Sequence, residues 1–123
     1  MQDLEQQLNF ILELDRLKAV YRQVTVKSDN NRRENSAEHS WHIALMAQTL
    51  NGYAAEPVNV ARVTIMLLIH DIVEIDAGDT FAFAQQADLD AQEAKELAAA
   101  ERIFGLLPAK QYQEMLNLWL EFE

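Results

Sequence analysis

The stretch VTIMLLIHDIVE, residues 63–74, decides the fold. Its first seven residues are apolar around nearly the whole circumference of a helix, which is typical of a buried central helix. We predict that this helix spans residues 60–75 and ends with His70, Asp71 and Glu74. Because Glu74 follows His70 by one helical turn, the three side chains can face one side. Unpartnered buried charges are costly, so the pattern predicts that a cation or ion pairs neutralise this cluster.

A second histidine is expected to join the cluster from another helix. A helix over residues 36–55 is predicted to open at Asn35 or Ser36, which places His39 near its start. Imidazole and carboxylate groups bind divalent cations, and a bound cation turns water into a nucleophile at neutral pH. The sequence therefore predicts metal-dependent hydrolysis. His42 follows at helical spacing, and we expect a structural or rim role for it.

The remaining periodicity predicts an all-α domain. The five expected helices cover residues 3–21, 36–55, 60–75 and 90–104, and a last segment from Pro108 through Leu120. Residues 79–89 lack clear periodicity and are expected to form a loop beside the site, a candidate substrate-facing lid. Trp41 is expected in the core or in a pocket wall.

Composition narrows the class of protein. The 123 residues have the length of one domain, and only three Gly and two Pro favour a compact helical fold. A formal net charge of −10 disfavours extended nucleic acid as a partner. The basic residues Lys27, Arg32 and Arg33 are clustered in the sequence, which suits the binding of a small phosphate ligand. The chain has no cysteine, which leaves His and carboxylate side chains as metal ligands. With no recognisable leader and no long apolar run, we expect a cytoplasmic protein without a membrane partner.

Two sequence blocks resemble a known family. RENSAEHSW, residues 33–41, and HDIVEIDAGDT, residues 70–80, are similar to motifs of the HD-domain phosphohydrolases, in the branch of the bacterial 5'-deoxynucleotidases. The resemblance extends from about Arg16 to Thr80 and joins spaced motifs, which makes it more specific than one adjacent His-Asp pair. It implies a helical HD-domain bundle that hydrolyses a phosphomonoester, with a nucleoside 5'-monophosphate as the expected substrate.

The resemblance also implies roles for single residues. The metal ligands would be His39, His70 and Asp71, and two further acids, Glu74 and Asp79, would lie near the attacking water or a second cation. Asp79 would orient or deprotonate that water. Glu74 would bind the second cation or protonate the leaving oxygen.

Substrate and cofactor follow from the same resemblance. Arg22 would bind the substrate phosphate, and Arg33, or else Lys27 or Arg32, would share that role. The cofactor is expected to be a divalent ion of Mn, Co, Fe, Ni, Zn or Mg, and the partner a small nucleotide. An apolar stripe on the last helix adds the expectation of a homo-oligomer.

One family feature is missing from the sequence. The resembling proteins supply a final metal-ligating Asp from a helix further downstream, and residues 1–123 stop before it. We therefore expect a single HD-type domain that is incomplete at its C-terminus. Alarmone hydrolases share the His-Asp signature but carry an acid where Ile75 follows Glu74, and cyclic-dinucleotide phosphodiesterases of the HD type carry a further motif. These two enzyme classes and a non-catalytic nucleotide-binding module stay open as alternatives.

Overall fold

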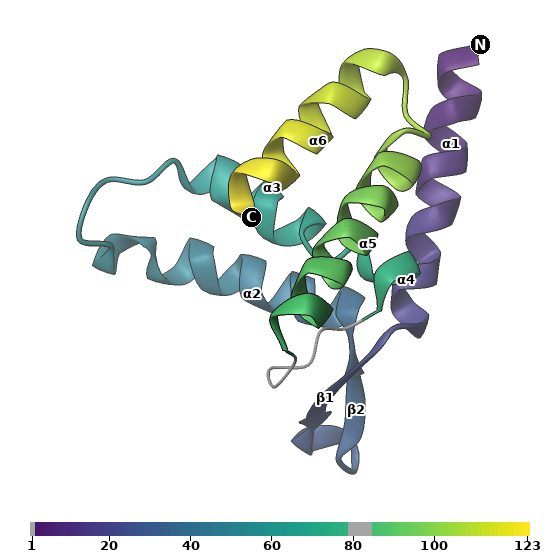
Figure 1. Ribbon diagram of the computed structural model, residues 1–123. Coiled ribbons are helices and arrows are strands. Elements are labelled where there is room, and N and C mark those ends of the chain that lie inside the picture. The colour runs from purple at the N-terminus through teal and green to yellow at the C-terminus, as the bar shows by residue number, and fades with distance from the viewer. Residues whose placement is uncertain (1, 79–84) are drawn as a thin grey trace.

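The computed structural model describes residues 2–78 and 85–123 of the chain. These residues are mainly helical, which confirms the predicted helical class (Figure 1). The α-helices are α1 (Gln2–Leu14), α2 (Ser36–Leu50), α3 (Val60–Ile69), α4 (Glu74–Ala77), α5 (Gln86–Phe104) and α6 (Ala109–Phe122). Between α1 and α2 lies a hairpin of β1 (Tyr21–Val26) and β2 (Arg32–Asn35), and short 3-10 helices are η1 (Asp15–Ala19), η2 (Lys27–Asp29) and η3 (Asn51–Tyr53).

Two groups of helices make up the body of the fold. Figure 1 shows α5 beside α1 and α6, whereas α2 runs alongside α3 and the hairpin projects away from the helices. α6 contacts α3 and so joins the two groups, and α4 packs on α5. This arrangement brings the start of α2, the end of α3 and the base of the hairpin to one region.

The hydrophobic core is built around α5. Ala100, Ile103 and Phe104 are fully buried, and the rings of Phe10 and Phe104 lie 6.3 Å apart. Trp119 of α6 packs against the same cluster. Burying a large apolar side chain stabilises a fold by about 1.5–3 kcal/mol, so these contacts hold α1 and α6 on α5.

The helix α3 is not the fully buried central helix that we predicted. It buries Met66 and Ile69, but Ile65 and Leu68 are 42% and 44% exposed. The reason is that α2 and α6 pack on part of its surface only, among the elements that the structure describes. A helix that carries apolar residues on nearly all sides is therefore not buried on all sides.

The helix α2 also carries exposed side chains. Trp41 is 61% exposed, so the expectation that it belongs to the core is wrong. Its ring lies 6.3 Å from the ring of His42, which is itself exposed and lines a shallow apolar groove with Leu45 and Met46.

The first predicted helix is too long, because the 3-10 helix η1 follows α1 at Asp15 and the hairpin begins at Tyr21. The helix α1 stops at Leu14, and β1 pairs antiparallel with β2 in the register Tyr21 to Asn35. The strand YRQVTV is rich in β-branched and aromatic residues, which favour strands. Asn30 and Asn31 have φ of 53° and 59° at the turn, a backbone conformation that Asn tolerates better than most residues.

The predicted helix over residues 60–75 is broken at the site. Between α3 and α4 the backbone makes tighter hydrogen bonds, from Ile72 N to Ile69 O at 3.1 Å and from Glu74 N to Asp71 O at 3.0 Å. The indole of Trp119 donates to the carbonyl oxygen of His70 at 3.3 Å and contacts this turn from α6.

Two further boundaries differ from the prediction. The helix α2 ends at Leu50 rather than at residue 55. The helix α5 begins at Gln86 rather than at residue 90, so the last part of the candidate lid is helical. Residues 79–84 of that segment lie outside the described residues. In the described ranges, we find no helix with the length and apolar character needed to cross a membrane.

Candidate metal centre

His70 and Asp71 are in direct contact at the turn after α3. The Nε2 atom of His70 lies 2.9 Å from Oδ1 of Asp71, and its Nδ1 atom lies 2.9 Å from the carbonyl oxygen of Leu67. A carbonyl only accepts, so Nδ1 carries a proton and Nε2 of a neutral ring presents a lone pair to the carboxylate. Two lone pairs at this distance repel each other unless a proton or a cation lies between them. The other oxygen of Asp71, Oδ2, is buried and has no hydrogen-bond partner among the described residues.

Burial and charge act against each other on both members of the pair. Burial lowers the pKa of His70, but the hydrogen bond and the charge of Asp71 outweigh it, so the pKa lies above its ordinary value. Burial likewise raises the pKa of Asp71, but the hydrogen bond from His70 and the charges of His70, His39 and Arg22 hold it below the ordinary value. The site therefore favours an ionised Asp71 surrounded by positive charge.

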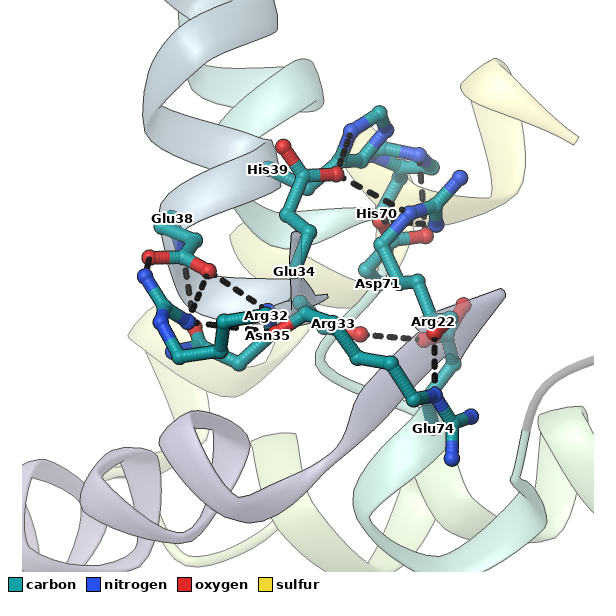
Figure 2. Close-up of polar contacts among 11 residues, drawn as sticks. Arg22, Arg32, Arg33, Glu34, Asn35, Glu38, His39, His70, Asp71 and Glu74 are labelled. Carbon is teal, nitrogen blue, oxygen red and sulfur yellow. Dashed lines mark hydrogen bonds and ion pairs between the residues drawn. The ribbon is translucent and has the colours of Figure 1, made fainter. Parts of the chain in front are cut away.

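Arg22 and His39 reach this pair from the hairpin and from α2. Arg22 Nη1 lies 3.9 Å from Asp71 Oδ2, and Arg22 Nε lies 3.4 Å from Oε1 of Glu34. The same Glu34 oxygen lies 3.1 Å from Nδ1 of His39. Figure 2 shows these side chains and His70 gathered together from β1, β2, α2 and the turn after α3.

A capping box fixes the position of His39. The side chain of Asn35 accepts from Glu38 N at 3.0 Å, and the Glu38 carboxylate accepts from Asn35 N at 2.7 Å. In addition, Ser36 N donates to Val20 O at 2.8 Å, which ties the start of α2 to the chain just before β1. The sequence prediction for the start of this helix is confirmed.

Glu74 approaches from α4 and is contacted by a residue that sequence reasoning did not identify. The hydroxyl of Ser36, which is fully buried, donates to Glu74 Oε2 at 2.7 Å. Ser36 was considered only as the start of a helix, because no local pattern indicates a contact across 38 positions. Arg102 of α5 anchors the same short helix through two hydrogen bonds to Asp76, of 2.5 and 2.9 Å.

The other candidate residues lie apart from the His70 pair or outside the described residues. Arg33 Nε donates to the carbonyl oxygen of Arg22 at 2.8 Å, and Figure 2 shows its guanidinium directed away from the histidines. Arg32 is paired with two carboxylates, and Lys27 is exposed in η2. Asp79 lies outside the described residues.

The end of α6 lies against the site, which was also not predicted. The ring of Phe122 lies 4.7 Å from the ring of His70. Burial raises the pKa of Glu123 above its ordinary value, although the charge of His70 acts in the opposite direction. The His70 ring is therefore partly covered by the last residues of the described chain.

The donor atoms suit a divalent cation. The candidate donors are Asp71 Oδ2, which accepts no hydrogen bond from the part of the chain that the structure describes, and Nε2 of His70 and of His39. For His39 the candidate is Nε2 because its Nδ1 faces Glu34. Across residues 2–78 and 85–123, no three His, Asp or Glu side chains are already arranged as ligands of one ion. The residue types nonetheless match the ligands of Mn, Fe, Co, Ni and Zn, so His39, His70 and Asp71 are the residues that would hold the ion.

A helical bundle that brings a His-Asp pair and a second histidine together is the arrangement of the HD-type domains. The chain belongs to the HD domain family, whose sequence model matches residues 14–123.

Individual relatives carry names that describe an activity. The human protein 5'-deoxynucleotidase HDDC2 is 29% identical over 116 residues, which are 94% of this chain and 55% of that protein. The 5'-deoxynucleotidase YfbR of Escherichia coli O127:H6 is 33% identical over 101 residues, which are 79% of this chain and 49% of that protein.

A solved structure is more similar still. The crystal structure of a predicted metal-dependent phosphohydrolase from Magnetospirillum magnetotacticum is 52% identical, with a TM-score of 0.86 over 99% of this chain and 61% of that chain. The present chain spans about half the length of the curated relatives that it matches.

Proposed function

We propose that this chain forms the metal-binding and phosphate-binding part of a 5'-deoxynucleotidase-like phosphohydrolase, within a single HD-type domain over residues 1–123. The observation that carries the proposal is the 3.9 Å separation of Arg22 Nη1 from Asp71 Oδ2, a buried oxygen that accepts no hydrogen bond from the described residues. Arg22, the proposed phosphate-binding residue, thus lies beside Asp71, a proposed metal ligand. The names of the relatives support a nucleoside 5'-monophosphate as the substrate.

Different residues would bind the metal ion and the substrate phosphate. A divalent ion held by His39, His70 and Asp71 would supply Lewis acidity and a water of lowered pKa. Arg22 binds the phosphate oxygens with charge-assisted hydrogen bonds and so orients the phosphorus for attack. Arg33 stabilises this arginine through its hydrogen bond to the Arg22 carbonyl, and its guanidinium is a second candidate for phosphate binding.

Two acids would move protons or hold a second ion. Ser36 orients Glu74 by its hydrogen bond of 2.7 Å, and Glu74 then protonates the leaving oxygen or binds a second cation. Asp79 is proposed to orient or deprotonate the attacking water, on the family resemblance alone.

The direct test is phosphate release from a panel of deoxyribonucleoside and ribonucleoside 5'-monophosphates. Each of Mn, Co, Fe, Ni, Zn and Mg is added in turn, and a chelator serves as the blank. We expect release with at least one ion and loss of release in Asp71→Asn, which keeps the side-chain shape. Equal release by wild type and Asp71→Asn would contradict the proposal.

A nucleotide-binding module without turnover is the second candidate. It is favoured by one observation, that the described residues do not include three side chains already arranged around one ion. This candidate predicts nucleotide binding by calorimetry and no phosphate release with any of the metals.

Two further parts of the proposal concern the cellular location of the protein and its self-association. A nucleotide substrate fits the cytoplasmic location expected from the sequence. Self-association is proposed because Leu120 and Phe122 on α6 are 47% and 41% exposed. Sedimentation at several concentrations tests it, and a monomer at every concentration would contradict it.

A further inference from the structure

Glu34 occupies an unusual position between two of the candidate site residues. It lies on β2 just before the cap of α2, and its side chain is only 14% exposed. One of its oxygens, Oε1, lies 3.1 Å from His39 Nδ1 and 3.4 Å from Arg22 Nε (Figure 2). The carboxylate thus contacts both a candidate metal ligand and the candidate phosphate-binding residue.

The contact with His39 selects which ring nitrogen is protonated. A carboxylate accepts a hydrogen bond from Nδ1–H, and this leaves the Nε2 lone pair available to a cation. A carboxylate behind a ligating imidazole also fixes the ring orientation and makes the ligand more basic. Glu34 is the acidic side chain that the described structure places against His39 Nδ1.

The contact with Arg22 works through charge. Arg22 Nε is buried and makes no hydrogen bond within the described residues, so Glu34 acts on it as an ion-pair partner. The far end of the guanidinium, Nη1, then lies 3.9 Å from Asp71 Oδ2. Without Glu34, the buried Nε would lose its nearest negative charge and the guanidinium would be less fixed beside the metal-binding oxygen.

We propose that Glu34 is a positioning residue that holds His39 in the metal-binding tautomer and Arg22 in the phosphate-binding orientation. The inference deepens the proposed function and rests on it, since it assumes that His39 binds the ion and Arg22 the phosphate. In this role Glu34 acts through His39 and Arg22, the two residues that its carboxylate contacts.

The first experiment needs no metal and no substrate, so it separates this inference from the proposed function. Nitrogen-15 spectra of the metal-free protein at about pH 8 report the tautomer of each neutral ring. We expect His39 to carry its proton on Nδ1 in the wild type and in Glu34→Gln, whose amide oxygen still accepts. In Glu34→Ala, we expect His39 to shift toward protonation on Nε2. An unchanged His39 tautomer in Glu34→Ala would overturn the proposal.

The second experiment measures metal affinity by calorimetry with Mn or Zn. We expect Glu34→Ala to weaken binding about 10- to 100-fold, the usual effect of removing the partner of a ligating histidine. Glu34→Gln should lie between wild type and Glu34→Ala. The matched control is Asp29→Asn, because Asp29 belongs to the same hairpin but pairs with Arg32. If wild type binds no metal, the proposed metal site fails; if Glu34→Ala binds as tightly as wild type, the role of Glu34 fails.

The third experiment isolates Arg22. Inorganic phosphate is titrated into metal-saturated wild type, Glu34→Ala, Arg22→Ala and the double variant. We expect Glu34→Ala to weaken phosphate binding only while Arg22 is present. An equal loss in both backgrounds would show that Glu34 does not act through Arg22, and circular dichroism of each variant confirms that the fold is intact.

Discussion

The buried hydroxyl of Ser36 donates a 2.7 Å hydrogen bond to the carboxylate of Glu74, and so connects the first turn of α2 to the first turn of α4. The two residues belong to separate sequence blocks, and the contact fixes how the acid is presented next to His70 and Asp71. The site therefore depends on a side chain that has no direct part in the chemistry.

We predict that Ser36→Ala lowers both turnover and stability. Loss of a buried hydrogen bond to a carboxylate should reduce the free energy of unfolding by about 1–3 kcal/mol and misplace Glu74. Urea unfolding and phosphate release measure the two effects. Ser40→Ala is the matched control, because Ser40 is buried on the same helix but its hydroxyl has no hydrogen-bond partner among the described residues. If the two variants behave alike, Ser36 has no special role.

We predict that Arg22→Ala weakens nucleotide binding more than metal binding. Loss of a charge-assisted contact to phosphate should cost about 1.5–3 kcal/mol of nucleotide affinity. Calorimetry with metal-loaded protein and a deoxynucleoside monophosphate measures it. Arg32→Ala serves as the control, since Arg32 is already paired with Asp29 and Glu38. If Arg22→Ala leaves the affinity unaltered and Arg33→Ala lowers it, the phosphate-binding role belongs to Arg33.

We predict that part of the stability is lost in acid because of Glu13. The hydrogen bond from Arg102, helped by Arg16, outweighs burial and holds the pKa of Glu13 below its ordinary value. A carboxyl group with a lowered pKa in the folded state stabilises the fold above its unfolded pKa. This contribution is lost as the pH falls through the folded pKa.

The variant Glu13→Gln should therefore be less stable than wild type near neutral pH by about 0.2–1 kcal/mol and should match it in acid. Urea unfolding at about pH 7 and about pH 3 gives both values. Glu5→Gln, an exposed carboxylate on the same helix, is the control. A constant difference between Glu13→Gln and wild type at both pH values would contradict the assignment.

Local signals in the sequence were sufficient for several features. The Asn35–Glu38 capping box starts α2 where expected, and the helix predicted from Pro108 begins one residue later, at Ala109. Figure 2 shows His39 gathered together with His70 and Asp71, as expected from the two sequence motifs. These features depend on neighbouring residues or on a motif that is specific by itself.

Features that depend on distant residues were not predicted. The break between α3 and α4 is contacted by Trp119 from α6, and the position of Glu74 depends on Ser36. The hairpin was not predicted, because the first predicted helix extends to Tyr21. The composition of the YRQVTV segment nevertheless favours a strand. The exposed face of α3 shows that an apolar sequence does not specify what covers it.

The most direct test of the central claim is the metal content of three proteins, the wild type, His70→Ala and Asp71→Ala. Each is incubated with a mixture of divalent ions, freed of excess ion, and measured by mass spectrometry. Our account predicts substantial occupancy in the wild type and a sharp loss in both variants, because each substitution deletes a donor atom without changing the rest of the turn. Unchanged occupancy in both variants would remove His70 and Asp71 from the metal site and contradict the account.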